Sequence, residues 1–165
     1  MKRRFLCLII SLAMLLSGCG IWREQINQSV RFHYLCKNYQ TDLCCVIVSE
    51  EREASGHVGD LPYLLALYLM GPTDEEHAMP LPAGTKISVL EEDGQIILEL
   101  SDTANVISDL DFSLACACLT MTVSEIADVA AVTIRCGNRE KTLSSENFTL
   151  YDINSETIPA AEEIS

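Results

Sequence analysis

The order of hydrophobic periods after residue 60 constrains the fold of this 165-residue chain more than any other feature. Two helix-period segments, near 61–70 and 111–122, enclose two segments in which apolar and polar residues alternate. Asp93-Gly94 joins these alternating segments and predicts a tight β-hairpin, because both residues tolerate positive φ angles. A last alternating segment follows the second helix and contains Val132, Ile134 and Cys136. The predicted order is helix, strand, strand, helix, strand.

The first helix carries clear signals at both of its ends. Asp60 can cap its start, and Pro62 suits its first turn. Its expected inward positions are Leu61, Leu64, Leu65 and Tyr68. Gly71 offers the left-handed conformation that ends a helix, and Pro72 prevents the helix from resuming. The second helix is predicted from Asp111 to Thr122. Asp109 or Asp111 would cap it, and its expected inner face is Leu114, Ala117, Cys118 and Met121.

Turn residues flank the hairpin, and we expect structural roles for them. Pro82 and Gly84 are predicted to shape the turn that leads through Thr85 into the first hairpin strand. Ser101 can hydrogen-bond local backbone where the second strand ends. The apolar positions that alternate within the two strands are Ile87, Val89, Ile96, Leu98 and Leu100. With Gly71, Pro72, Asp93 and Gly94, these turn residues form the predicted structural motif.

A strand pair is predicted before the first helix. Apolar positions from Val30 to Cys36 alternate with Arg31 and His33, which indicates a half-buried strand with His33 on its polar side. Leu43–Val48 is a continuous apolar run and predicts a more central strand of the same sheet. The ranges 49–60 and 73–84 are predicted loops. Together the elements predict a two-layer α+β domain of sheet and helices, in which an αββαβ core is preceded by a β-hairpin.

The N-terminus resembles a bacterial lipoprotein signal. Lys2, Arg3 and Arg4 precede a short apolar run, and Leu16-Ser17-Gly18-Cys19 resembles a lipobox. The run is too short to span a bilayer, which takes roughly 20 apolar residues. We therefore expect lipidation of Cys19, with acyl chains that hold the protein on the outer face of the cell membrane. An ordinary secretory signal that ends near a cysteine is the alternative.

The expected organisation is a signal peptide (1–18), a lipidated cysteine and tether (19–29), a folded domain (30–143) and an acidic tail (144–165). Without the signal the chain keeps 8 basic and 24 acidic residues, a net charge of −16. Such a surface excludes nucleic acid as a partner, and it would be repelled by anionic headgroups. The lipid on Cys19 must therefore anchor the protein without help from a basic patch.

Six further cysteines lie in or beside apolar runs: Cys36, Cys44, Cys45, Cys116, Cys118 and Cys136. Their spacing is not that of a zinc site, so we expect buried free thiols. A bridge from Cys36 to Cys44 across the first hairpin is the alternative, and the sequence leaves the redox state of all six open.

Candidate chemical groups are few. His33, His57 and His77 lack the spacing of a hydrolase or zinc-protease motif. Three kinds of site are conceivable: a metal site using His57 or His77, a carboxylate pair working as a wall hydrolase, and a calcium site at Asp102, Asp109 and Asp111. The alternative is that these side chains are charges exposed to solvent. Solvated charges account for all of them. We expect no enzyme activity, no cofactor and no metal.

Several segments in order resemble the GerMN domain family of bacterial sporulation and spore germination proteins. The matching residues span about 43–143 and comprise Tyr68-Leu69-Met70-Gly71-Pro72, Leu81-Pro82-Ala83-Gly84-Thr85-Lys86, Leu98-Glu99-Leu100-Ser101, Leu119-Thr120 and Val129 to Gly137. The resemblance implies an extracytoplasmic lipoprotein domain, similar in element order to ring-building motifs, whose motif residues mark turns and core positions rather than catalytic groups.

We therefore expect a lipid-anchored, noncatalytic module that acts through protein contacts, with a protein partner or a homo-oligomer, in sporulation, germination or envelope assembly. The alternative is a lipoprotein that binds a small ligand or a wall fragment. Such a pocket would need aromatic side chains, yet the only tryptophan is Trp22 in the tether.

Overall fold

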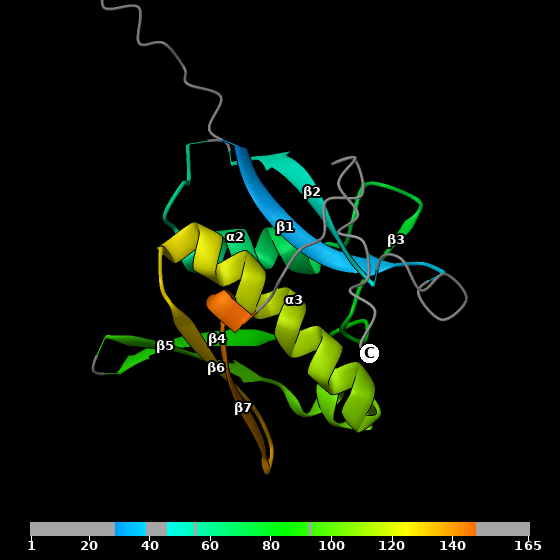
Figure 1. Ribbon diagram of the computed structural model, residues 1–165, viewed down its shortest axis with the longest axis vertical. Coiled ribbons are helices and arrows are strands. Elements are labelled where there is room, and N and C mark those ends of the chain that lie inside the picture. Colours follow the sequence, from blue (N-terminus) through cyan, green and yellow to red (C-terminus); the bar gives the residue numbers. More distant parts are fainter. Residues whose placement is uncertain (1–28, 39–45, 55, 93, 148–165) are drawn as a thin grey trace, which may run out of the picture.

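The computed structural model describes residues 29–38, 46–54, 56–92 and 94–147, and their strands form two sheets (Figure 1). The first sheet has the order β2-β1-β3, with β1 at Ser29–Cys36, β2 at Ile47–Glu53 and β3 at His77–Ala78. The second has the order β4-β5-β6-β7, with β4 at Ile87–Glu92, β5 at Gln95–Leu100, β6 at Ala131–Cys136 and β7 at Arg139–Ser144. The helices are α2 (Leu61–Leu69) and α3 (Asp109–Ala127), with short 3-10 turns η1 (Asp102–Val106) and η2 (Ser145–Asn147).

The second sheet contains the predicted core. β4 and β5 pair antiparallel, and Gly94 in their turn has φ +76°. The chain then crosses through α3, so that β6 pairs parallel to β5, and β7 returns antiparallel to β6. The predicted α+β class is confirmed, and so is the αββαβ order of α2, β4, β5, α3 and β6 after an N-terminal strand pair.

Helix α3 packs against both sheets. It contacts β1 on one side and β6 and β7 on the other (Figure 1). Every residue from Ala115 to Val123 is buried, so a one-sided inner face was the wrong expectation for this helix, and Leu114 is only partly buried. By length and mean hydropathy (1.4) α3 could cross a bilayer, but 56% of the window concerned is buried within the protein. A helix that is apolar on all sides belongs in a core of this kind.

The boundaries of α3 also differ from the prediction. Ser108 is the N-cap, since its Oγ accepts a hydrogen bond from the Asp111 amide at 3.1 Å, and neither Asp109 nor Asp111 caps the helix. The helix continues past Thr122 to Ala127 and ends at Asp128, which has φ +51°. A serine hydroxyl caps as well as a carboxylate does, so the nearby acids hid the true start.

Helix α2 agrees with its sequence signals. Asp60 Oδ1 accepts a hydrogen bond from the Tyr63 amide at 3.1 Å, and Gly71 has φ +91° just past the helix end. The four predicted inward residues, Leu61, Leu64, Leu65 and Tyr68, are its buried residues.

The second strand lies elsewhere than predicted. β2 begins at Ile47 and continues through Glu53, across charged residues that were expected to form a loop. It pairs with β1 alone and is therefore an edge strand rather than a central one. Its side chains still alternate, but beyond the partly buried Val48 the inward positions are Glu50 and Arg52, which are charged and bound to partners. A hydrophobic period cannot reveal such a strand.

His33 does not lie on a solvent-facing side of β1, as the alternation predicted. It is 1% exposed, because α3 packs against β1 and its Thr122 contacts His33 directly. The strand β3 and the strand β7, which follows the turn at Gly137-Asn138, were not predicted.

Four cysteines in the described residues, Cys36, Cys116, Cys118 and Cys136, are free. The Cys36 amide donates a hydrogen bond to the Val46 carbonyl at 3.0 Å. Cys44 and Cys45 lie outside the described residues, as do Cys19, Asp93, the whole predicted signal and most of the predicted tether and tail.

Candidate functional site

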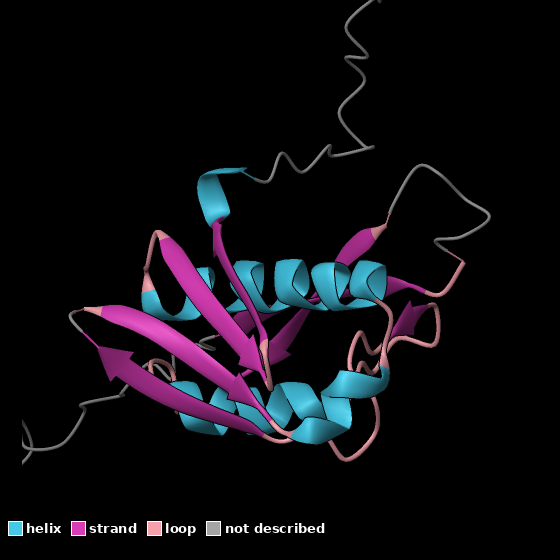
Figure 2. Ribbon diagram, turned by 90° about the horizontal axis from the view of Figure 1, so that it is seen from below, coloured by secondary structure: helices cyan, strands magenta, loops and turns pink. Residues whose placement is uncertain are grey.

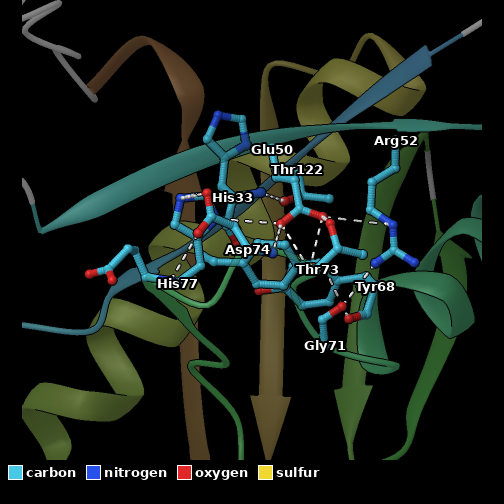
Figure 3. Close-up of polar contacts among 11 residues, drawn as sticks. His33, Glu50, Arg52, Tyr68, Gly71, Thr73, Asp74, His77 and Thr122 are labelled. Carbon is cyan, nitrogen blue, oxygen red and sulfur yellow. Dashed lines mark hydrogen bonds and ion pairs between the residues drawn. The ribbon is translucent and has the colours of Figure 1, made fainter.

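The densest group of polar side chains surrounds Glu50 of β2 (Figure 3). Its carboxylate accepts hydrogen bonds from the Thr73 amide (3.0 Å), the Thr73 hydroxyl (2.7 Å) and the Asp74 amide (3.2 Å). Nδ1 of His77 lies 3.4 Å from the same carboxylate, whose side chain is only 9% exposed. Glu50 therefore ties the edge strand β2 to the segment that links α2 and β3.

Arg52 extends this group along β2. Its Nη1 donates a hydrogen bond to the Gly71 carbonyl at 2.8 Å, and its guanidinium lies 5.7 Å from the centre of the Phe32 ring. Nε approaches Glu50 at 3.9 Å. The arginine thus binds a carbonyl at the end of α2, where the last turn of a helix has no internal donor.

The ionisation of Glu50 follows from these contacts. Burial alone would raise the pKa of its carboxyl, but the hydrogen bonds from Thr73, Asp74 and His77 outweigh burial and lower the pKa below its ordinary value. A carboxylate held in its charged form by four internal contacts is a poor proton donor at neutral pH.

A second polar group closes the edge of β1 that faces away from β2. The His33 amide donates to Thr122 Oγ1 of α3 at 2.9 Å, and the Tyr68 hydroxyl of α2 donates to the His33 carbonyl at 3.0 Å. The ring of Tyr68 also stacks on Tyr34, with centroids 4.8 Å apart. Side chains from two helices therefore occupy the backbone groups that another strand would otherwise bind.

The imidazole of His33 has no hydrogen-bond partner in the described residues. Burial and, to a smaller extent, the nearby Arg31 together lower the pKa of His33 to about 4. Nε2 lies 3.9 Å from Glu125, which also contacts Arg31 at 3.4 Å. His33 is therefore a neutral ring packed between β1 and α3.

These groups do not form a catalytic arrangement. The hydrogen bonds of these side chains go to internal backbone groups and to neighbouring side chains, as those of Glu50, Arg52, Thr73 and Tyr68 show. The sequence had singled out none of these residues for a polar role. Glu50-Glu51-Arg52 offered one usable signal, since charges two apart can share one side of a strand. Across the described ranges, no three His, Cys, Asp or Glu side chains are grouped so that they could hold a metal ion.

The predicted motif residues lie at turns. Thr85 donates hydrogen bonds to the Pro82 carbonyl from its amide (3.2 Å) and its hydroxyl (2.8 Å), across Gly84 with φ +82°. Ser101 Oγ accepts from the Lys86 amide at 3.0 Å, and the Ser101 amide donates to the Lys86 carbonyl at 2.9 Å. Ser101 thus binds a residue across the hairpin, and it also binds its own neighbours, since its hydroxyl donates to Thr103 Oγ1 (3.5 Å) and its carbonyl accepts from the Ala104 amide (3.0 Å).

The other residues that the sequence offered as metal or calcium ligands lie apart from one another. His57 is exposed and stacks on Tyr63, with centroids 3.9 Å apart. Asp109 lies 3.8 Å from Arg139, while Asp102 receives a hydrogen bond from Asn105. Asp111 binds the Ser108 hydroxyl at 2.7 Å. The structure therefore does not bring the three aspartates together around a common centre.

Arg139 explains the loop in which two of these aspartates lie. Its guanidinium stacks on Phe112 at 4.1 Å and donates to the carbonyls of Ala104 (2.6 Å) and Ile107 (3.2 Å). The cation therefore stabilises the connection from η1 to α3.

The fold defines an α+β domain, and the solved structures similar to it include GerMN domains. The first GerMN domain of the sporulation protein GerM from Bacillus subtilis has a TM-score of 0.49 and 19% identity, covering 69% of this chain and 86% of that one. The tandem GerMN domains of the same protein give 0.48 and 18%, covering 69% of this chain and 40% of that one. A "Putative Lipoprotein" from Clostridium perfringens gives 0.44 and 20%, covering 73% and 91%.

No family model matches the sequence, and neither does any curated protein. The GerMN domains recur among the similar structures, and they are the family that the sequence segments resemble. At these identities and TM-scores the similarity assigns no residue role.

Proposed function

We propose that this protein is a lipid-anchored, noncatalytic module that acts through protein contacts on the outer face of the cell membrane, in sporulation, germination or envelope assembly. The observation that carries the proposal is the Leu16-Ser17-Gly18-Cys19 motif after a basic start and a short apolar run. Only a thiol at that position can take the thioether-linked lipid, and two or more acyl chains suffice for durable anchoring.

The polar groups of the folded part support a role without catalysis. A general acid or base must reach a substrate, and a nucleophile needs a base beside it. Glu50 is instead held by Thr73, Asp74 and His77, and the His33 ring is buried. These side chains stabilise the junction of β1, β2 and α2, so they favour a rigid binding module over an enzyme.

Membrane fractionation of cells that produce the full chain tests the anchor. We expect the wild-type protein in the membrane pellet and a Cys19→Ala variant in the soluble fraction or left with its signal uncleaved, because the lipid cannot be attached. Cys36→Ala is the matched control and should stay in the pellet. A Cys19→Ala protein that is cleaved normally and pellets as before would show that lipid on Cys19 does not hold it.

Chemical crosslinking in intact membranes tests the contact role. Confinement to a membrane raises the effective concentration of the module without any new contact, so complexes should form that dilute protein misses. A protein that stays monomeric in membranes and binds a wall fragment specifically would instead support the ligand-binding alternative.

A further inference from the structure

The outer strand β4 leaves one row of backbone groups without a strand partner in the described part of the chain. The Ser101 amide donates to the Lys86 carbonyl, the Lys86 amide donates to Ser101 Oγ, and the ladder pairs Ile87 with Leu100. Because bonded and non-bonded pairs alternate in an antiparallel ladder, Ser88 and Leu90 point their amides and carbonyls toward β5. Those of Ile87, Val89 and Glu91 point outward, to the free edge.

This edge has few of the features that keep edges from pairing. It has no proline and no bulge in its register, and Leu90 on it is 37% exposed. Natural edge strands usually carry inward charges, proline or a covering element. Its charges, Glu91 and Glu92, are confined to one end, and Lys86 lies just before the other end.

These end charges make β4 complementary to itself. In an antiparallel pair of two β4 strands centred on Val89, residue 87 lies opposite 91 of the other copy, and 89 lies opposite 89. Every outward amide then meets an outward carbonyl. The same register places Lys86 opposite Glu92 of the other copy twice, on the face of the sheet that turns away from the helices, and opposite charges facing across strands are stabilising.

The other open edges lack this match. A register centred on Thr142 of β7 places Glu140 opposite Ser144, and Arg139 there is already bound to Ala104 and Ile107. On β2 the register centred on the outward residue Glu51 places Glu51 opposite itself, which is repulsive. It would also place Glu50 opposite Arg52, but these side chains are already held by Thr73 and Gly71. Among β2, β4 and β7, only β4 pairs opposite charges in a symmetric register without placing a like charge opposite itself or using side chains already bound within the domain.

Helix α2 lies beside β4 (Figure 2). Its side chains add an apolar surface there. The helix contains no charged residue, and its exposed positions are Pro62, Tyr63 and Ala66. Tyr63 is 38% exposed, Ala66 is exposed, and Met70 just after the helix is 78% exposed, at spacings that place them along one stripe. A helix that is apolar on all sides is normally covered.

We propose that β4 pairs antiparallel with β4 of a second copy, so that two four-stranded sheets become one and the two α2 helices cover the seam. The inference rests on the proposed function, because it names a second copy as the partner. A closed two-fold contact of this kind uses the same patch on both copies. The acidic surface keeps dilute copies apart, and anchoring to the membrane overcomes this repulsion.

Site-specific crosslinking of the full chain in membrane vesicles tests the pairing. Ser88 of one copy lies opposite Leu90 of the other, so Ser88→Cys with Leu90→Cys should form a covalent dimer on mild oxidation. The matched control is Glu140→Cys with Thr142→Cys on β7, and wild type measures the background of the native cysteines. Dimer from the β4 pair alone is expected. Equal dimer from both edges would overturn the proposal.

Charge reversal separates pairing from folding. Lys86→Glu or Glu92→Lys alone should lower the dimerisation constant roughly tenfold, since each replaces two attractive pairs by two repulsive ones. The double variant Lys86→Glu with Glu92→Lys restores both pairs in reverse and should recover dimer to within about threefold of wild type. Single variants that dimerise as wild type does, or a double variant that fails to recover, would contradict the register.

Sedimentation of the same full-length variants in detergent, at rising protein concentration, measures dimerisation through β4 without a membrane. Loss of membrane association with intact β4 dimers would therefore refute the anchor and keep the pairing. Membrane-bound protein without β4 dimers would refute the pairing and keep the anchor. Binding of the α2 stripe to phosphatidylcholine vesicles, abolished by Met70→Asp while crosslinking is unchanged, would assign that stripe to lipid and overturn its place in the seam.

Discussion

The first sheet protects its edges, whereas the second leaves β4 open. On β1, Thr122 and Tyr68 occupy the backbone groups of His33, and β3 covers the next residues. On β2, Glu50 and Arg52 point inward and are held by Thr73 and Gly71. β4 has neither device. The difference indicates that the first sheet is built to hold the domain together and that the second has an edge available for contact.

The largest expected effect on stability is at the edge of β1 that Tyr68 and Thr122 close. Tyr68→Ala removes a fully buried ring that stacks on Tyr34 and leaves the His33 carbonyl unpaired. We expect a loss of roughly 3 to 5 kcal/mol in the free energy of unfolding. Chemical denaturation would measure it, with Tyr63→Ala on the exposed side of the same helix as control. Equal losses for the two variants would mean that Tyr68 does not close the edge.

Proline substitutions compare the two sides of one strand. Ser88→Pro removes an amide that bonds to β5 and should cost about 3 kcal/mol or more. Val89→Pro removes an outward amide and should cost roughly 1 kcal/mol or less, since proline is tolerated where an edge N–H faces solvent. Thermal melts of both variants check this order. If Val89→Pro were the more damaging, the assigned direction of the β4 amides would be reversed.

Acid should lower the free energy of unfolding through His33, whose ring is buried between β1 and α3. Its pKa is lowered to about 4 in the folded protein, against an ordinary 6.5, so the unfolded chain takes up the proton first as pH falls. The contribution of His33 to the free energy of unfolding is therefore fully present above about pH 6.5. It declines between pH 6.5 and 4, by on the order of 3 kcal/mol. His33→Phe should flatten this decline, as seen in melts at pH 7, 5.5 and 4.5.

Arg31 and Glu125 are the charged groups that approach His33, and both remain in the His33→Phe variant. Subtracting the two pH profiles therefore removes the contribution of the carboxylates. Identical profiles would show that the buried imidazole does not titrate in this window.

Local signals made much of the second sheet predictable. The ends of α2 are marked by Asp60, Pro62 and Gly71, and the hairpin turn is marked by Gly94. Each of these residues acts on its own neighbours in the sequence. β2 escaped prediction because its inward side chains are charged and find partners in a distant loop. The turn at Gly137-Asn138 indicated an end of β6, but β7 follows it with alternating charges that hid the strand.

The polar groups were harder to predict than the elements. His33 is buried by Thr122, which lies 89 residues further along the chain, so no local pattern could place it. The network around Glu50 likewise depends on the packing of the 71–77 segment against β2. Side chains that act across the fold are decided by tertiary packing rather than by periodicity.

Residue-resolved hydrogen exchange on the full chain in detergent tests the contrast between the sheets most directly. At low protein concentration the outward amides of β4, such as Val89 and Glu91, should exchange as fast as the outward amides of β2, such as Ser49 and Glu51. At high concentration we predict that the β4 amides slow at least tenfold while the β2 amides do not change. Protection that appears on β2, or on neither strand, would contradict the account.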